Sequence, residues 1–213
     1  MCYFIVKNIL RITRNYNFHK SEVEQVDVKG AAVISIPIFI LKKFGQADYE
    51  KWLGSLSPEA RNVYSSPINK TVWFPLKMIM TEPTAKLCEL FFNNSVRGAW
   101  ECGRYSAEYS LKGVYKALIR LSSPQVIIKR AGSIMESYYR PSKMDVVDTG
   151  KAHVTVQITE FTEMDTYIEN RIAGWMERAL EICGCRNVTV TTTQSLVAFQ
   201  QYTEFKIHWR KSL

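Results

Sequence analysis

The sequence predicts an α+β fold in which a helical N-terminal half packs on a four-stranded antiparallel sheet. Two observations lead to this prediction. Apolar residues recur every three to four positions through the first two thirds of the chain, a spacing typical of amphipathic helices. After Pro141 the period changes to two, and the remaining chain has the pattern strand, strand, helix, strand, strand (β-β-α-β-β). Helices first and an antiparallel sheet later is the order of an α+β domain.

Residues 98–121 are predicted to form the central helix of this fold. Wrapped at 3.6 residues per turn, their charged side chains fall on one stripe and their small side chains on the opposite stripe. A glycine inside a helix costs roughly 1 kcal/mol against alanine, so the small stripe implies close approach of another helix, a sheet or a bound molecule. The charged stripe is Arg97, Glu101, Arg104, Glu108, Lys112 and Lys116, and the small stripe is Ala99, Gly103, Ser106, Ser110, Gly113 and Ala117.

Shorter helices are expected before this stretch, because serine, proline and glycine punctuate segments with one apolar face. Residues 71–80 are apolar and aromatic around Pro75, and we interpret them as a buried turn that leads into a short helix. The expected helices begin near Ser35, Tyr49, Ser57 and Pro83.

The pattern changes from helix to sheet after residue 123. Ser123 is a suitable N-cap for a helix that Pro141 ends, since the residue before a proline is disfavoured in the helical region. Residues 144–147 and 152–161 then predict a hairpin about Asp148-Thr149-Gly150.

The last part of the chain completes the sheet. Residues 166–183 have one apolar side at helical spacing, and Gly184 is a natural C-terminal stop. Residues 187–198 and 202–209 alternate apolar and polar side chains, which predicts two more strands.

Composition limits the class of protein. The chain has 213 residues, 46% of them hydrophobic, which is enough for a packed core. We expect residues 1–24 to be a basic extension or helix and residues 25–213 to be a single domain. No run of eighteen apolar residues predicts a membrane span, and no signal-peptide order is present, so we expect a cytoplasmic protein. The net charge of +8 is mixed with acids throughout, so nucleic acid is not the expected partner.

With these elements in place, five segments carry a resemblance to known proteins: VKGAAVISIPIFILKKFG, WFP, GAWECGRYSAEYSLKGVY, IENRIAGWMERALEICG and TEFKIHW. In these segments the sequence resembles the 4-vinyl-reductase domain and its wider superfamily. That group includes the haem-based nitric-oxide sensor domains and the small subunits of the Golgi transport tethering complex. The resemblance covers residues 28–210, and an uncharacterised bacterial paralogous family within the group is the most similar.

The resemblance implies a hydrophobic pocket between the central helices and the sheet, which different branches fill with haem, acyl chains or small aromatic effectors. Residues 139–143, YRPSK, depart from the Tyr-x-Ser-x-Arg motif of the haem sensors, and the only histidines are His19, His153 and His208. We therefore expect no haem. Many 4-vinyl-reductase domains have cysteines after the last helix and in the final hairpin, which can hold zinc. Here Cys183 and Cys185 lie near the first position, but Thr203 stands at the second, so two cysteines and His208 fall short of the four ligands of a structural site and zinc is not expected. The remaining cysteines, Cys88 and Cys102, are expected to be buried small hydrophobes.

Aromatic residues around the small stripe are the candidate binding residues. They could form a plain aromatic core, or they could form a pocket wall in which the glycines leave room for a ligand. Arg104 and Glu108 are expected to form a solvated pair rather than a substrate clamp. The candidate ligand-binding residues are Trp73, Phe74, Trp100, Gly103, Tyr105, Tyr109 and Trp175.

The sequence contains no grouping of nucleophile, base and orienting residue, so an enzyme is not the favoured class. We predict an intracellular binding or sensing domain that holds a small hydrophobic molecule or acyl chain and signals through a homodimer or another protein. The alternative is a ligand-free assembly subunit that associates through the sheet edge or the small stripe.

Overall fold

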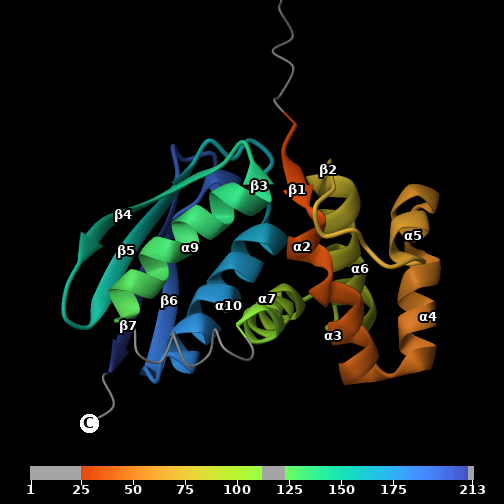
Figure 1. Cartoon of the computed structure of the whole chain (residues 1–213), viewed down its shortest axis with the longest axis horizontal. Coiled ribbons are helices and arrows are strands. Elements are labelled where there is room, and N and C mark those ends of the chain that lie inside the picture. The colour runs from red at the N-terminus through yellow and green to blue at the C-terminus, as the bar shows by residue number, and fades with distance from the viewer. Residues whose placement is uncertain (1–24, 112–122, 211–213) are drawn as a thin grey trace, which may run out of the picture.

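A computed structural model describes residues 25–111 and 123–210 of the chain. Figure 1 shows the four-stranded sheet at one end of the molecule and the N-terminal helices at the other, with α7, α9 and α10 between them. This arrangement confirms the predicted α+β class with a helical N-terminal half and a later antiparallel sheet. The predictions for residues 1–24 and for the second half of the central helix lie outside the described residues.

The sheet has the strand order β4-β5-β7-β6, and every neighbouring pair is antiparallel. One helix, α10, separates the two hairpins, so the predicted order β-β-α-β-β is confirmed. Val154, Val156 and Ile158 alternate along the central strand β5 and are completely buried. The strands are β4 (Lys143–Thr149), β5 (His153–Thr159), β6 (Arg186–Gln194) and β7 (Thr203–Arg210).

Two turns of the sheet differ from the prediction. Asp148 and Thr149 belong to β4 rather than to the turn, because a bulge after Val146 lengthens the strand and the backbone of Gly150 closes the hairpin on His153. Strand β6 ends at Gln194, and the predicted strand residues Leu196–Ala198 form a short 3₁₀ helix. The Ser195 hydroxyl caps this helix by accepting from the Val197 N–H at 3.0 Å, which offers the backbone an alternative to sheet pairing.

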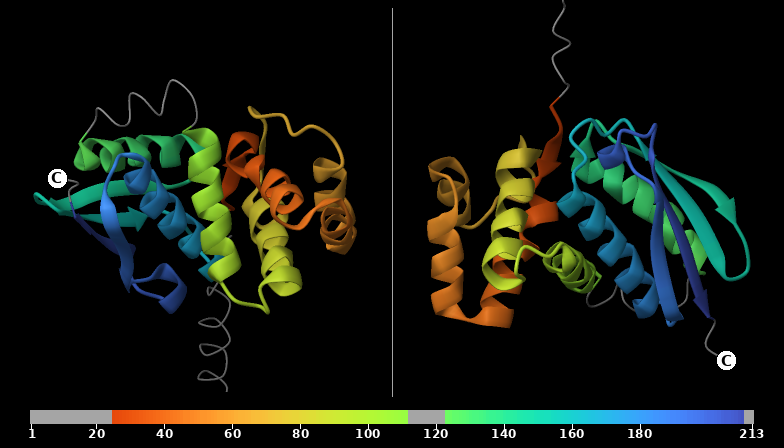
Figure 2. Two further views of the ribbon diagram at one scale, coloured as in Figure 1. Left: turned by 90° about the horizontal axis from the view of Figure 1, so that it is seen from below. Right: turned by 180° about the vertical axis from the view of Figure 1, so that it is seen from behind.

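Two helices, α9 (Pro124–Tyr138) and α10 (Thr166–Ile182), pack against the sheet, α9 on β4 and α10 on β6. Both begin at side-chain caps, since Ser123 accepts from Val126 N–H and Asp165 accepts from Ile168 N–H. The predicted start at Ser123 is therefore confirmed. Figure 2 shows these helices lying between the sheet and the rest of the molecule.

The N-terminal helices pack beyond α7 (Arg97–Ser110), which makes its largest contact with α10. Helix α3 ends at Gly45, whose φ of +91° lies in the left-handed region that favours glycine, and Ser57 caps α5 as predicted. These helices are α2 (Gly30–Val33), α3 (Ser35–Phe44), α4 (Gln46–Ser55), α5 (Pro58–Tyr64), the π-helix η1 (Lys77–Thr81) and α6 (Glu82–Phe91).

A second, small sheet corrects the interpretation of residues 71–80 as a turn. Its strands are β1 (Asp27–Lys29), β2 (Trp73–Pro75) and β3 (Tyr139–Arg140), in the order β2-β1-β3. Strand β1 pairs with β2 on one side and with β3 on the other, so the backbone N–H and C=O groups of these segments find partners in one another. Pairing between segments that are distant in the chain leaves no local pattern in the sequence. Within the described ranges, no helix combines the length and the apolar character that a membrane span needs.

Candidate ligand-binding site

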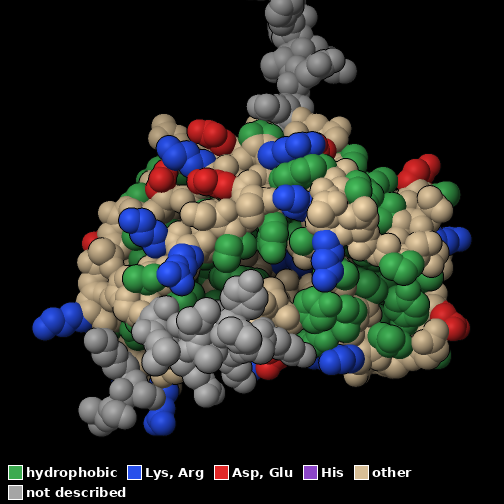
Figure 3. Space-filling model, in the orientation of Figure 1, with side chains coloured by type: hydrophobic (Ala, Val, Ile, Leu, Met, Phe, Trp, Pro, Cys, Tyr) green, Lys and Arg blue, Asp and Glu red, His purple; other side chains and the backbone are tan. Residues whose placement is uncertain are grey.

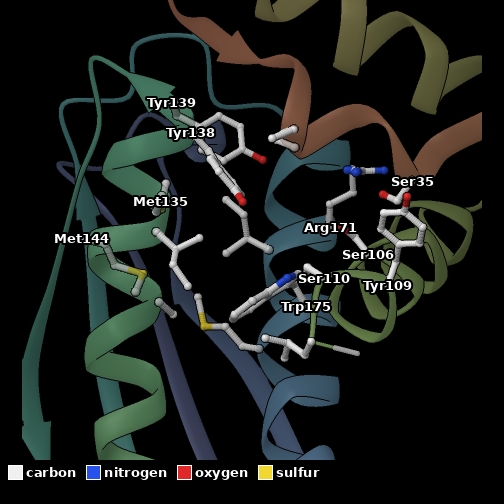
Figure 4. Close-up of a pocket in the computed structure, with 18 residues that line it drawn as sticks. Ser35, Ser106, Tyr109, Ser110, Met135, Tyr138, Tyr139, Met144, Arg171 and Trp175 are labelled. Carbon is white, nitrogen blue, oxygen red and sulfur yellow. The ribbon is translucent and has the colours of Figure 1, made fainter. Parts of the chain in front are cut away.

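A cavity of about 380 Å³ lies beside the central helix α7. Its walls come from α7, α9 and α10, with the α2–α3 segment and the beginnings of β3 and β4 at its edges. Figure 4 shows side chains from α9 and from α10 facing each other across this space. Ile134, Met135, Met144, Ile172 and Met176 supply much of its apolar lining. The volume lies in the range of small-molecule pockets, which are concave and mostly apolar.

Two glycines form the contact between α7 and α10 at one edge of the cavity. A Cβ at Gly103 would lie 2.1 Å from the carbonyl oxygen of Arg171, and a Cβ at Gly174 would lie 2.1 Å from that of Trp100. Each helix therefore places its backbone against a glycine of the other. Side chains fill the space at Gly98, since a Cβ there would lie 2.9 Å from the side chains of Leu87 and Cys88 on α6. At these two positions of α7, neighbouring helices rather than a ligand occupy the space that the small side chains leave.

Ion pairs hold the same two helices together along their exposed side. Arg104 pairs with Glu177 at 2.6 Å and with Glu181 at 2.7 Å, both on α10. Glu108 pairs instead with Arg178 at 2.7 Å, so the predicted pairing of Arg104 with Glu108 is wrong. Helical spacing predicts which side chains are neighbours on the same helix. Here α10 lies close enough to α7 for Arg104 and Glu108 each to pair with an oppositely charged side chain of α10 instead.

These contacts shift the pKa values of the carboxyl groups in opposite directions. Burial raises the pKa of Glu177 above its usual range, and the attraction of Arg104 offsets only part of that effect. Burial also acts to raise the pKa of Glu181, but hydrogen bonds from Arg104 and Arg178 outweigh it and lower the pKa. The cluster is thus a structural clamp beside the cavity, and none of its residues lines the cavity.

The polar part of the lining consists of hydroxyl groups and one guanidinium. Ser35, Ser106 and Tyr109 contribute hydroxyls, and Arg171 contributes the guanidinium from α10. Arg171 is 4% exposed, and its Nη1 donates to the Cys102 thiol at 2.8 Å. Burial raises the pKa of that thiol, so it is uncharged at neutral pH. Cys102 and Cys88 are both completely buried, as predicted.

Some of the predicted binding residues line the cavity and others lie elsewhere in the structure. Gly103, Tyr109 and Trp175 line the cavity. Trp100 lies over the clamp, where its Nε1 donates to Glu177 at 3.1 Å, and Tyr105 packs against Phe39 of α3.

Trp73 and Phe74 lie in strand β2, away from the cavity lining. The Trp73 ring makes cation–π contacts with Lys29 and Arg140, whose cations lie 5.1 Å and 4.2 Å from its centroid. Sequence reasoning missed Ser35 and Arg171, and the methionines of α9, β4 and α10. The signal available for Arg171 was its position three residues before Gly174 on the same helix.

The cavity does not fit a haem held by histidine. No histidine or cysteine of the described ranges lines it, so its walls offer neither an imidazole nor a thiolate as an axial ligand. His153 pairs with Asp148 at 3.1 Å on the sheet, and His208 is exposed on β7. Among the described residues, no cluster of three or more His, Cys, Asp or Glu could hold a metal ion.

The sequence matches no protein-family model and no curated protein. Solved structures do match. An H-NOX protein from S. oneidensis in the Fe(II)NO ligation state has a TM-score of 0.66 at 6% identity, covering 86% of this chain and 99% of that one. An H-NOX protein from K. algicida, Fe(II) unliganded, has a TM-score of 0.63 at 12% identity, with 87% and 98% covered. The IWP-051-bound H-NOX from Shewanella woodyi has a TM-score of 0.59 at 13% identity, with 86% and 94% covered.

These likenesses define the class of fold. The chain has the fold of haem-NO-binding (H-NOX) domains over nearly the full length of the matched structures, which confirms the resemblance inferred from the sequence. Identities of 6% to 13% establish the fold alone. What this chain binds must be argued from its own cavity.

Proposed function

We propose that this protein is a non-enzymatic sensing domain that binds a small, mainly hydrophobic molecule in the cavity beside α7. The observation that carries the proposal is the cavity itself, about 380 Å³ with a mostly apolar lining, inside an H-NOX fold. A concave, mainly apolar site with a few polar groups is the usual form of a small-molecule binding site.

The side chains around the cavity favour binding over catalysis. In the described ranges, the Ser110 hydroxyl donates to the carbonyl of Ala107 in its own helix and has no base beside it. Cys102 accepts a hydrogen bond from Arg171, and the raised pKa of the Cys102 side chain keeps it as a thiol rather than a nucleophilic thiolate. Neither group has the partner that covalent catalysis requires.

The alternative of a ligand-free assembly subunit has one supporting observation. Hydrophobic side chains gather over α3 in Figure 3, and a groove there is lined by Ile34, Pro37 and Ile38. Leu41 on the same helix is 43% exposed. The small stripe of α7 is a weaker candidate for self-association, because α10 covers Gly103. A dimer, if the protein forms one, would use α3 rather than this stripe.

The binding proposal is tested with 1-aminoanthracene, a neutral aromatic probe that fluoresces in apolar surroundings. We expect saturable binding to the full chain and loss of binding in Ser106→Phe, which fills the cavity from α7. Ser133→Phe on α9 is the matched control, because Ser133 is exposed and does not line the cavity.

Extraction of natively purified protein followed by mass spectrometry tests for a resident ligand. Equal probe binding in both phenylalanine variants would contradict the assignment of this cavity. No saturable probe binding and no extracted ligand would contradict the function.

A further inference from the structure

Arg171 carries a buried positive charge whose counter-charge is missing from the described part of the protein. The side chain is 4% exposed, and no aspartate or glutamate of the described ranges forms an ion pair with it. The guanidinium cannot lose its proton in a protein. Removing a charge from water costs several kcal/mol unless an opposite charge and hydrogen bonds compensate.

The groups that surround Arg171 do not supply that compensation. Its electrostatic neighbours are Cys102, Tyr139 and Tyr64. Burial raises the pKa of each of these groups, so all three are uncharged at neutral pH. The Tyr64 hydroxyl also donates its proton elsewhere, to the carbonyl oxygen of Ile79 at 2.6 Å. The guanidinium therefore has neutral acceptors and no anion.

A second polar group on the same cavity, a hydroxyl, has no hydrogen-bond partner in the described part of the protein. The hydroxyl of Ser35 is buried, with the residue 2% exposed, and it forms no hydrogen bond although it lines the cavity. Such a group normally has a partner when buried. Figure 4 shows the guanidinium of Arg171 extending toward the α2–α3 segment, the side from which Ser35 comes. The buried charge of Arg171 and the unpaired hydroxyl of Ser35 thus belong to one end of the cavity.

The remaining lining limits the chemistry of the missing group. No aspartate, glutamate, lysine or second arginine lines the cavity in the described ranges. A single guanidinium matches a carboxylate, whose two oxygens accept its parallel N–H groups. A phosphate carries about −1.5 to −2 charges, which one cation does not balance. The rest of the lining is dominated by methionine, isoleucine and aromatic side chains, which suit an apolar body.

We propose that the ligand of this cavity is an apolar carboxylic acid, held by its carboxylate at Arg171 and Ser35 and by its apolar part among the side chains of α9 and α10. This inference rests on the proposed function, because it specifies the ligand of the same cavity. The geometry requires no covalent step.

The test compares two ligands that differ in the charged group alone. Decanoate and decanol are each used to displace 1-aminoanthracene from the full-length protein at pH 7. We expect decanoate to bind about tenfold to a hundredfold more tightly, the range for a charge-assisted hydrogen-bonded pair. Decanamide, which is polar but neutral, is expected to bind like decanol.

Variants assign that preference to Arg171. Arg171→Met keeps an unbranched side chain and removes the guanidinium with its charge, and we expect it to bind decanoate no more tightly than decanol while still binding the neutral probe. Ser35→Ala is expected to reduce the preference severalfold, through loss of one hydrogen bond to a charged group. Arg178→Met is the matched control, since Arg178 lies on the same helix but pairs with Glu108 and Glu181 outside the cavity. It is expected to keep the full preference.

The outcomes separate the two proposals. Equal binding of decanoate and decanol to the unmodified protein would overturn the carboxylate inference and leave the hydrophobic binding function standing. The same inference fails if Arg171→Met, folded by circular dichroism, keeps the preference. Should that variant not fold, the comparison of decanoate, decanol and decanamide on the unmodified protein decides the matter alone. Failure of the probe and of all three displacers to bind would overturn the binding function itself.

Discussion

The reciprocal glycine contact between α7 and α10 gives the most direct test of how the fold is held together. Replacing Gly103 by alanine places a Cβ 2.1 Å from the carbonyl oxygen of Arg171, a backbone atom that cannot rotate away. The helices would have to separate by roughly 1 Å or more before that contact reached ordinary van der Waals distance. Such a separation would disturb the Arg104 ion pairs to Glu177 and Glu181.

The magnitude follows from two opposing terms. Alanine in a helix interior is favoured over glycine by about 1 kcal/mol. Overpacking a close contact costs about 1–3 kcal/mol and occasionally more, and the loss of the clamp adds to that cost. We therefore expect Gly103→Ala to lower the free energy of unfolding by about 2 kcal/mol, and Gly174→Ala to do the same because its Cβ would meet the Trp100 carbonyl at the same distance of 2.1 Å.

Urea unfolding followed by far-UV circular dichroism measures this change. Gly54→Ala in α4 is the matched control, because no atom lies within 4 Å of its Cβ position, and it should be neutral or stabilising by up to about 1 kcal/mol. The double variant of Gly103 and Gly174 should lose less than the sum of the single losses, since one separation of the helices makes room for both methyl groups. A Gly103→Ala protein as stable as the unmodified chain would refute the reasoning.

Two further predictions concern titratable groups. Because the folded-state pKa of Glu181 is lowered, its stabilising effect is present above its unfolded pKa of about 4.3 and is lost as the pH falls through the folded value. Glu181→Gln should therefore be less stable by about 1 kcal/mol at pH 7, with the difference shrinking below about pH 4 in urea titrations, and a constant difference would contradict the assignment. Burial raises the pKa of Cys88 to about 11 and that of Cys183 to about 12, so at pH 8 fewer than about one in a thousand of these thiols is ionised. Both should resist iodoacetamide in the native protein and react after unfolding, as peptide mass mapping would show, and rapid native labelling of Cys88 would contradict its burial.

The fold was predictable from the sequence because its signals are local. Ser57 and Ser123 cap their helices as their spacing to the following proline indicated, and Gly45 ends α3 in the left-handed conformation. The alternation of Val154, Val156 and Ile158 with polar residues indicated a strand with one buried face, and these three residues are completely buried in β5. Each of these features depends on residues within a few positions of one another.

The small sheet was not predictable in the same way. Strand β1 pairs Val28 with Phe74 on one side and with Tyr139 on the other, so each partner is distant in the chain. Strands of two and three residues are too short to show a period. Trp73 and Phe74 were consequently grouped with the aromatic residues near α7, whereas pairing with β1 places them in this sheet.

The burial of Arg171 was not predicted, because the sequence of residues 166–183 indicates a helix with a single apolar, buried side. Ile168, Met176 and Leu180 do form that face and are at most 1% exposed, and Arg171 is not part of it. The helix is buried on a second side as well, where α7 packs against it.

Gly174 carried the signal for that second side. The reasoning that required a close neighbour at Gly103 applies equally to Gly174, and a residue three positions earlier on a helix lies on the same face. Arg171 is that residue, so its charge had to enter a helix–helix interface and meet whatever the adjoining cavity contains. A glycine pair that locates an interface thus also locates the charge buried beside it, and a buried charge without an internal partner indicates the polarity of the ligand.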